Sequence, residues 1–122
     1  MNRAPDIEAV ISFLRTEDGG RRSPAFSGYR PHHKVREDYQ TSGVHEYIDR
    51  DHVAPGDQAL GRITFISPEA YPGCLWIGRE ILIQEGSRIV GRARVTKIMN
   101  QLLEKKGEPA GTDNDGAAPR PV

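Results

Sequence analysis

Four histidines and one cysteine are the side chains of this 122-residue chain best suited to metal binding or nucleophilic catalysis. His32 and His33 are adjacent, so on a strand they point to opposite faces and cannot hold one ion together. None of the histidines, which also include His45 and His52, is spaced as zinc ligands are. The sequence therefore predicts no metal site and no cofactor. It also predicts that Cys74, the single cysteine, is a structural thiol without a disulfide partner.

Two other patterns bear on enzymatic chemistry. Residues 49–52 read Asp-Arg-Asp-His, which suggests acid–base chemistry, but they precede a Pro-Gly turn and are more typical of a solvated loop. The run Gly-x-x-x-x-Gly-Lys-Ser/Thr, whose backbone amides and lysine hold nucleotide phosphates, does not occur. The sequence thus favours a protein that is not an enzyme.

Short segments between frequent Gly and Pro turns position these side chains. Apolar and polar residues alternate over 7–14, 60–66, 80–84 and 88–99, which is typical of half-buried β-strands. In the last of these segments the alternation places Ile89 on the inner face. Residues 7–14 also fit helical spacing, so their pattern alone leaves helix and strand open. Several strands joined by turns suggest a small antiparallel barrel or sandwich.

The amino-acid composition limits which partners and which compartment we expect for this protein. Seventeen basic and seventeen acidic residues cancel, which argues against a general polyanion binder such as a DNA-coating protein. The charge is nevertheless segregated: residues 1–36 and 60–99 each carry +3, and residues 37–59 carry −5. The two basic stretches could face one partner or be ordinary surface. No long apolar run or signal sequence is present, so we expect a cytoplasmic protein without a membrane partner.

The end of the chain differs in composition. Residues 107–122 are rich in Gly, Pro, Ala and Asp and contain no aliphatic side chain larger than alanine except Val122. Such a segment buries too little apolar area to offset its ordering entropy. We therefore expect one folded domain over residues 1–100, and over residues 101–122 a short helical turn followed by a disordered tail.

A set of ordered motifs resembles the third, C-terminal β-barrel domain of elongation factor Tu. Residues 19–31 carry Gly-Gly-Arg and Gly-Tyr-Arg-Pro, as the opening of that domain does. Thr-Ser-Gly at 41–43 is similar to its Val-Thr-Gly turn, Pro-Gly-Asp recurs at 55–57, and residues 84–91 are similar to its Arg-Glu-Gly-Gly-Arg hairpin. The resemblance covers about residues 5–99. It implies that residues 7–14 form a strand and that the chain is all-β, a freestanding six-stranded antiparallel barrel without a GTPase domain.

The resemblance also implies a binding function. One side of this barrel in the family holds the T-stem backbone of aminoacyl-tRNA. In this reading Arg21 or Arg22 binds phosphate, the Gly86 amide faces a phosphate, and Glu85 accepts from a ribose hydroxyl. His32 and Ser42 complete the matched set. The alternative is that these turns are kept because the barrel needs them.

The chain departs from the family where that domain has an aromatic-rich strand. Residues 32–36 read His-His-Lys-Val-Arg in place of Gln-Phe-Tyr-Phe-Arg. One interpretation is that a former interdomain face has become polar, because a lone barrel must avoid exposed apolar patches. The other is a new basic surface made by the histidines, Lys34, Arg36, Arg92 and Arg94.

Two functional hypotheses follow. The first is a non-catalytic module that engages tRNA or a translation complex containing it. The second is a protein-interaction module, a mimic or decoy of elongation factor Tu that binds a GTPase, an exchange factor or a toxin. An exposed Trp76 could anchor such a partner. Alternatively, Trp76, Tyr71, Tyr29 and Phe26 fill one end of the barrel.

Overall fold

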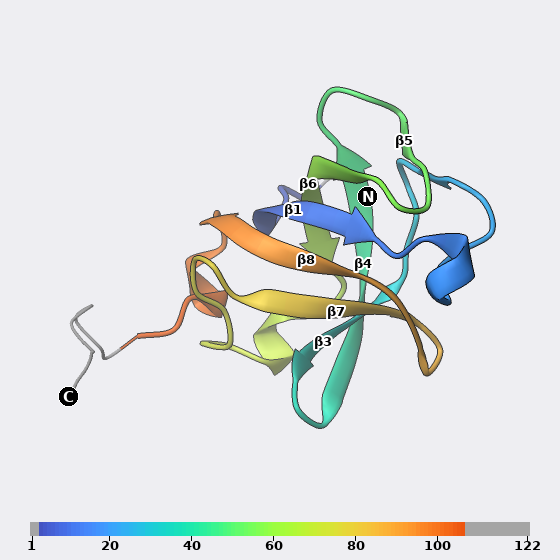
Figure 1. Ribbon diagram of the computed structural model, residues 1–122. Coiled ribbons are helices and arrows are strands. Elements are labelled where there is room, and N and C mark those ends of the chain that lie inside the picture. The colour runs from blue at the N-terminus through green and yellow to red at the C-terminus, as the bar shows by residue number, and fades with distance from the viewer. Residues whose placement is uncertain (1–2, 107–122) are drawn as a thin grey trace.

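The computed structural model describes residues 3–106, which form a closed antiparallel barrel with strand order β1-β6-β4-β3-β7-β8 (Figure 1). A separate two-stranded sheet pairs β2 with β5. The barrel strands are β1 (Ile7–Phe13), β3 (His32–Arg36), β4 (Tyr39–Tyr47), β6 (Gln58–Phe65), β7 (Glu80–Glu85) and β8 (Arg88–Ile98). The shorter elements are β2 (Ala25–Phe26), β5 (His52–Val53) and the 3-10 turns η1 (Thr16–Asp18), η2 (Pro68–Ala70) and η3 (Gln101–Leu103). Among the described residues, no helix is long and apolar enough to span a bilayer.

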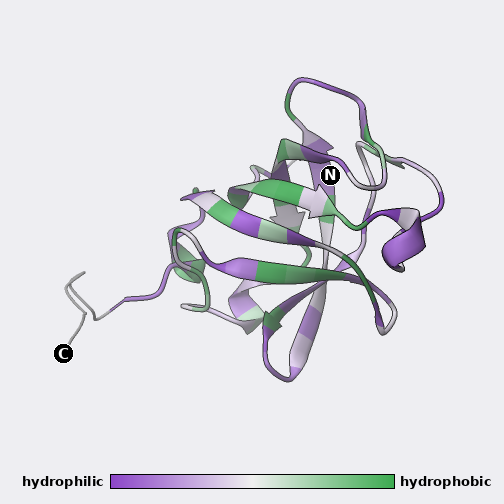
Figure 2. Ribbon diagram, viewed as in Figure 1, coloured by the Kyte–Doolittle hydropathy of each residue, from purple (hydrophilic) through white to green (hydrophobic). Residues whose placement is uncertain are grey.

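The alternating segments form the barrel as the sequence predicts. In β1 every second side chain, from Ile7 to Phe13, is buried inside the cylinder, while those between are half exposed. β1 lies between β6 and β8 and is a strand rather than a helix. Hydrophobic and hydrophilic residues accordingly alternate along the ribbon in Figure 2. The prediction of an all-β, six-stranded antiparallel barrel is confirmed.

Two local predictions were wrong. Residues 41–43 form no turn: they lie in the middle of β4, where Ser42 pairs with His32. Ile89 is not on the inner face, because a bulge in β8 opposite Ile83 and Gln84 buries both Val90 and Gly91 and turns Ile89 outward. A bulge adds one unpaired residue to a strand and so reverses the facing of the residues beyond it.

The segment that follows β8 packs back onto the barrel. Leu103 in η3 is fully buried, and its carbonyl accepts a hydrogen bond of 2.8 Å from the amide of Leu75. The Lys105 amide in turn donates to the Leu75 carbonyl at 2.8 Å. A short turn thus occurs where the sequence predicted one, and ordered packing continues to Lys105. The expected disorder of residues 107–122 lies outside the described residues.

A buried carboxylate fastens the two ends of the barrel chain together. The side chain of Asp6 accepts hydrogen bonds from the Phe65 amide at 2.7 Å, from the Asn100 amide group at 2.8 Å and from Arg3 at 2.6 and 3.1 Å. Its backbone carbonyl accepts from the amides of Met99 and Asn100. One fully buried residue therefore ties the entry to β1, the end of β6 and the exit from β8.

We predict that Asp6→Ala lowers the free energy of unfolding by about 2–4 kcal/mol, because it leaves the Phe65 amide buried without an acceptor. Urea denaturation followed by circular dichroism measures the change. Asp49→Ala, which removes an exposed carboxylate, is the matched control and should stay within about 0.5 kcal/mol of wild type. Equal stability of Asp6→Ala and the control would contradict this role.

Candidate nucleic-acid interface

The loop after β1 and the β7–β8 hairpin meet at one end of the barrel. The guanidinium of Arg21 forms an ion pair with the Glu85 carboxylate. The Tyr29 hydroxyl donates to the same carboxylate oxygen at 2.6 Å, and the Arg21 guanidinium lies 4.4 Å from the centre of the Tyr29 ring. The structure therefore brings together two residues that lie 64 positions apart and that the sequence placed in one site.

These contacts change the part that Arg21 can play. Partial burial works to raise the pKa of Glu85, but hydrogen bonds from Tyr29 and Arg21 outweigh it and hold that pKa below its usual value. The Arg21 side chain is only 19% exposed and also donates to the Pro24 carbonyl at 3.2 Å. Arg21 thus fixes the hairpin to the loop, and Arg22 beside it is the exposed cation without an ion-pair partner among the described residues.

The tip of the hairpin is exposed beside this ion pair. Glu85 pairs with Arg88, which leaves Gly86 and Ser87 as a two-residue turn. Gly86 has a φ of +63°, a conformation that favours glycine. The turn is therefore built for the hairpin whether or not it meets a ligand.

A row of basic side chains runs along the outer face of β3. His32, Lys34 and Arg36 occupy alternate positions and point away from the buried His33 and Val35. Alternate residues of a strand are about 6.7 Å apart, close to the spacing of successive phosphates in a nucleic-acid strand.

Arg30 adds a fourth basic side chain to this row. Bonds from the His45 amide to the Tyr29 carbonyl and from the Gly43 amide to the Pro31 carbonyl continue the pairing with β4 and place Arg30 at the next outer position. The sequence analysis did not assign Arg30 a role, although its alternation with the β3 cations was visible. We call Arg30, His32, Lys34 and Arg36 the β3 basic row; it is about 20 Å long.

A second set of cations lies parallel to this row on β8. Leu82 of β7 pairs with Lys34 on one side and with Arg92 on the other, so these two cations are about 10 Å apart across the sheet. Arg94 follows two positions along β8 on the same outer face, and Glu80 is the carboxylate beside it and 3.5 Å from Arg92. Lys34, Arg36, Arg92 and Arg94, predicted as an additional basic surface, therefore lie on the two strands that flank β7, on one side of the barrel.

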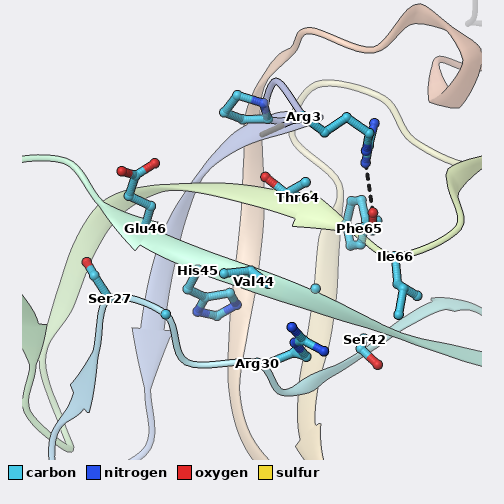
Figure 3. Close-up of a pocket in the computed structure, with 13 residues that line it drawn as sticks. Arg3, Ser27, Arg30, Ser42, Val44, His45, Glu46, Thr64, Phe65 and Ile66 are labelled. Carbon is cyan, nitrogen blue, oxygen red and sulfur yellow. Dashed lines mark hydrogen bonds between the residues drawn. The ribbon is translucent and has the colours of Figure 1, made fainter. Parts of the chain in front are cut away.

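Beside the β3 basic row, the outer face of β4 is hollowed. The hollow has a volume of about 390 Å³, and Arg30 and Arg3 form opposite walls over Val44 (Figure 3). The hydroxyl groups of Ser42 and Thr64 line it between them. Arg3 is held by a 2.7 Å hydrogen bond to the Phe65 carbonyl, drawn dashed in Figure 3. The Glu46 carboxylate also lines the hollow, and Arg3 is already paired with Asp6, so Arg30 and the two hydroxyls are the groups that can meet a sugar and a phosphate.

Gln84 lies opposite His32 in the same sheet. Its side-chain oxygen is buried and has no hydrogen-bond partner among residues 3–106. Leaving such an acceptor unpaired costs free energy.

His33 does not join the basic surface, contrary to one interpretation of the sequence. It is fully buried inside the barrel, with its Nε2 2.8 Å from Nε2 of His45, which is also fully buried. The Thr41 carbonyl, 3.2 Å from His33 Nδ1, can only accept, so Nδ1 carries the proton and Nε2 of a neutral His33 accepts from His45. His45 Nδ1 then accepts from the Tyr47 hydroxyl at 3.1 Å. Because the two Nε2 atoms face each other with room for a single proton between them, this buried chain cannot hold both histidines as cations.

Burial accordingly lowers the pKa of both imidazoles. The pKa of His33 falls to about 4, and that of His45 lies well below its usual value through burial and the neighbouring His33. In the unfolded chain both take up a proton near pH 6.5. Below that pH the unfolded state binds more protons than the folded state, so stability is complete above pH 6.5 and is lost as the pH falls towards 4.

We predict that the free energy of unfolding falls by about 2–4 kcal/mol between pH 7.5 and pH 5, with both buried histidines contributing. Urea denaturation at the two pH values measures this difference. His32→Asn and His52→Asn, which change exposed histidines, should keep the whole pH dependence. A free energy of unfolding that is the same at both pH values would contradict the neutral pair.

The remaining candidate residues are either buried in the core or exposed to solvent. Cys74 is 8% exposed, and burial raises the pKa of its thiol. Residues 49–52 are exposed, as expected of a solvated loop. Tyr71 fills the barrel end and is fully buried, whereas Phe26 and Trp76 are 56% and 46% exposed. The expectation that all four aromatic residues fill one end of the barrel is therefore wrong for Phe26 and Trp76, and a role of the exposed Trp76 as an anchor stays a prediction.

A scan of the chain against models of known protein families found no match. The resemblance to the third domain of elongation factor Tu therefore rests on the ordered sequence motifs, and membership of that family stays a prediction.

Proposed function

We propose that this protein is a non-catalytic RNA-binding module that holds the double-stranded stem of a tRNA, alone or within a translation complex, without hydrolysing GTP. The observation that carries the proposal is the β3 basic row. Its four basic side chains face outward at alternate positions, and none of them has an ion-pair partner among the described residues. Lys/Arg contacts to phosphates supply most of the affinity in such complexes.

The residues around the row support an RNA ligand. Arg22 and the Glu85–Gly86 hairpin adjoin one end, and Ser42 lies beside His32. Hydroxyl and carboxylate groups placed among cations are suited to ribose 2′-hydroxyls between phosphates, which is how proteins distinguish A-form RNA. The roles predicted for Arg22, His32, Ser42, Glu85 and Gly86 are retained in this proposal, and Arg21 becomes a positioning residue.

The arrangement of the two basic strands favours a double helix over a single strand. The cations of β3 and β8 form parallel rows separated by the neutral β7 positions Leu82 and Gln84. Two rows about 10 Å apart can contact two phosphate backbones across a groove. Tyr39, which pairs with Arg36, is an exposed aromatic ring beside the β3 basic row and packs against Tyr71. A single ring offers less than the successive stacking platforms that single-stranded ligands require.

A titration of labelled tRNA at low and moderate salt tests the proposal. We predict salt-dependent binding that Arg22→Glu and Lys34→Glu each weaken about tenfold, with the slope of log K against log salt reduced by about one per lost phosphate contact. An RNA duplex of the T-stem sequence should compete with tRNA, and a DNA duplex of the same sequence should compete less well.

Arg50→Glu is the matched control, because it reverses an exposed cation on the loop before β5, away from the β3 basic row. Circular dichroism verifies that all three variants fold. Absence of tRNA binding even at low salt, or equal weakening by Arg50→Glu, would overturn the proposal. The decoy hypothesis would then be the better account of the chain.

A further inference from the structure

A second exposed surface lies at the opposite end of β7 from the Glu85–Gly86 hairpin. Trp76 and Ile77, on the loop that leads into β7, are 46% and 59% exposed. Bonds between Gly78 and Val95 and between Arg79 and Val95 fasten this loop to β8. The six residues of β7 separate it from the hairpin by about 20 Å. Figure 1 shows the loop and the hairpin at opposite ends of β7.

Two cations lie against the exposed indole. The guanidinium of Arg79 is 5.0 Å, and the ammonium of Lys105 is 5.4 Å, from the centre of the Trp76 ring. Arg79 also donates a hydrogen bond to the Cys74 carbonyl, and the backbone of Lys105 is bonded to Leu75. The fold therefore holds the Arg79 guanidinium beside the ring and fixes the backbone of Lys105 next to it. We call Trp76, Ile77, Arg79 and Lys105 the Trp76 surface.

We propose that the Trp76 surface docks an acidic protein segment that carries an apolar anchor residue. Exposed tryptophans flanked by arginine are the residue types that dominate binding energy at protein interfaces. Covering Trp76 and Ile77 removes apolar area from water, which drives association. Carboxylates of the partner can pair with Arg79 and Lys105 where these side chains already stand, so charge complementarity selects an acidic segment.

Charge and geometry disfavour three other occupants. A second copy, related by a two-fold axis, would bring Arg79 and Lys105 close to their own copies, and like charges repel. A nucleobase would have to displace these cations to stack on the indole. The chain's own residues 107–122 are acidic at Glu108, Asp113 and Asp115 but offer no large apolar anchor.

Selection from a random 12-residue peptide library displayed on phage tests the proposal. The library is panned on the full chain and counter-panned on Trp76→Ala. We expect Trp76-dependent peptides enriched in Asp and Glu around Leu, Phe or Trp. Enrichment without an acidic bias, or no Trp76-dependent enrichment, would overturn the proposal.

Affinities of selected peptides sharpen the test. Trp76 is the only tryptophan, so a selected peptide without tryptophan should shift the intrinsic emission of the chain on binding. Lys105→Glu should weaken binding at least tenfold, whereas Lys97→Glu, an exposed cation on β8 that does not contact the ring, should have little effect.

Further measurements identify the competing occupants. Sedimentation that shows a dimer lost in Trp76→Ala would assign the surface to a second copy. Displacement of a selected peptide by an oligouridylate or by a synthetic peptide of residues 107–122 would assign it to nucleic acid or to the chain's own end. Either result would overturn the proposal. Trp76→Ala should leave tRNA binding unchanged, so failure here and failure of the RNA proposal are distinguishable.

Discussion

Closure of six strands into one cylinder gives every strand an inner and an outer row, and the chemistry of this protein follows from that division. The inner row must be apolar or fully hydrogen-bonded, because water does not reach it. The outer row is free to carry charge. His32 and His33 show the consequence most clearly: they are neighbours in sequence, yet one is exposed beside cations and the other is neutral in a buried hydrogen-bonded chain.

The strands could be predicted from the sequence because alternation is a local property. The spacing of Ile7, Ala9 and Ile11 needs no knowledge of the rest of the chain to indicate a half-buried strand. The bulge at Val90 could not be predicted this way, since it depends on the register between β7 and β8. Likewise His45 meets His33 only because of how β3 and β4 pair, so no spacing rule for histidines could have found the pair.

The candidate site was predicted in part for the same reason. Motifs placed Arg21 and Glu85 in one region, and the structure brings them into contact. The motifs could not show which charged side chains form ion pairs within the protein and which are available to a ligand. Arg21 and Glu85 neutralise each other, while Arg30, to which no role was assigned, faces outward. Whether a charged side chain is available to a ligand depends on its nearest counter-ion, which belongs to tertiary structure rather than to sequence.

The charged residues are unevenly distributed over the surface, although the net charge of the chain is zero. Asp49, Asp51 and Asp57 lie on or next to the loop that carries β5, at the top of the view in Figure 1, whereas the β3 basic row and the β8 cations lie on the strands below it. Such an asymmetric field attracts a polyanion to one side and repels it from the other, although the net charge is zero.

Because a closed barrel is a rigid support, the surfaces on it keep fixed positions relative to one another. The Trp76 surface lies at the far end of β7 from the hairpin, and there Arg94, paired with Glu80, is next to it. Under the two proposals, a partner protein and an RNA stem would thus occupy adjoining surfaces of one rigid barrel.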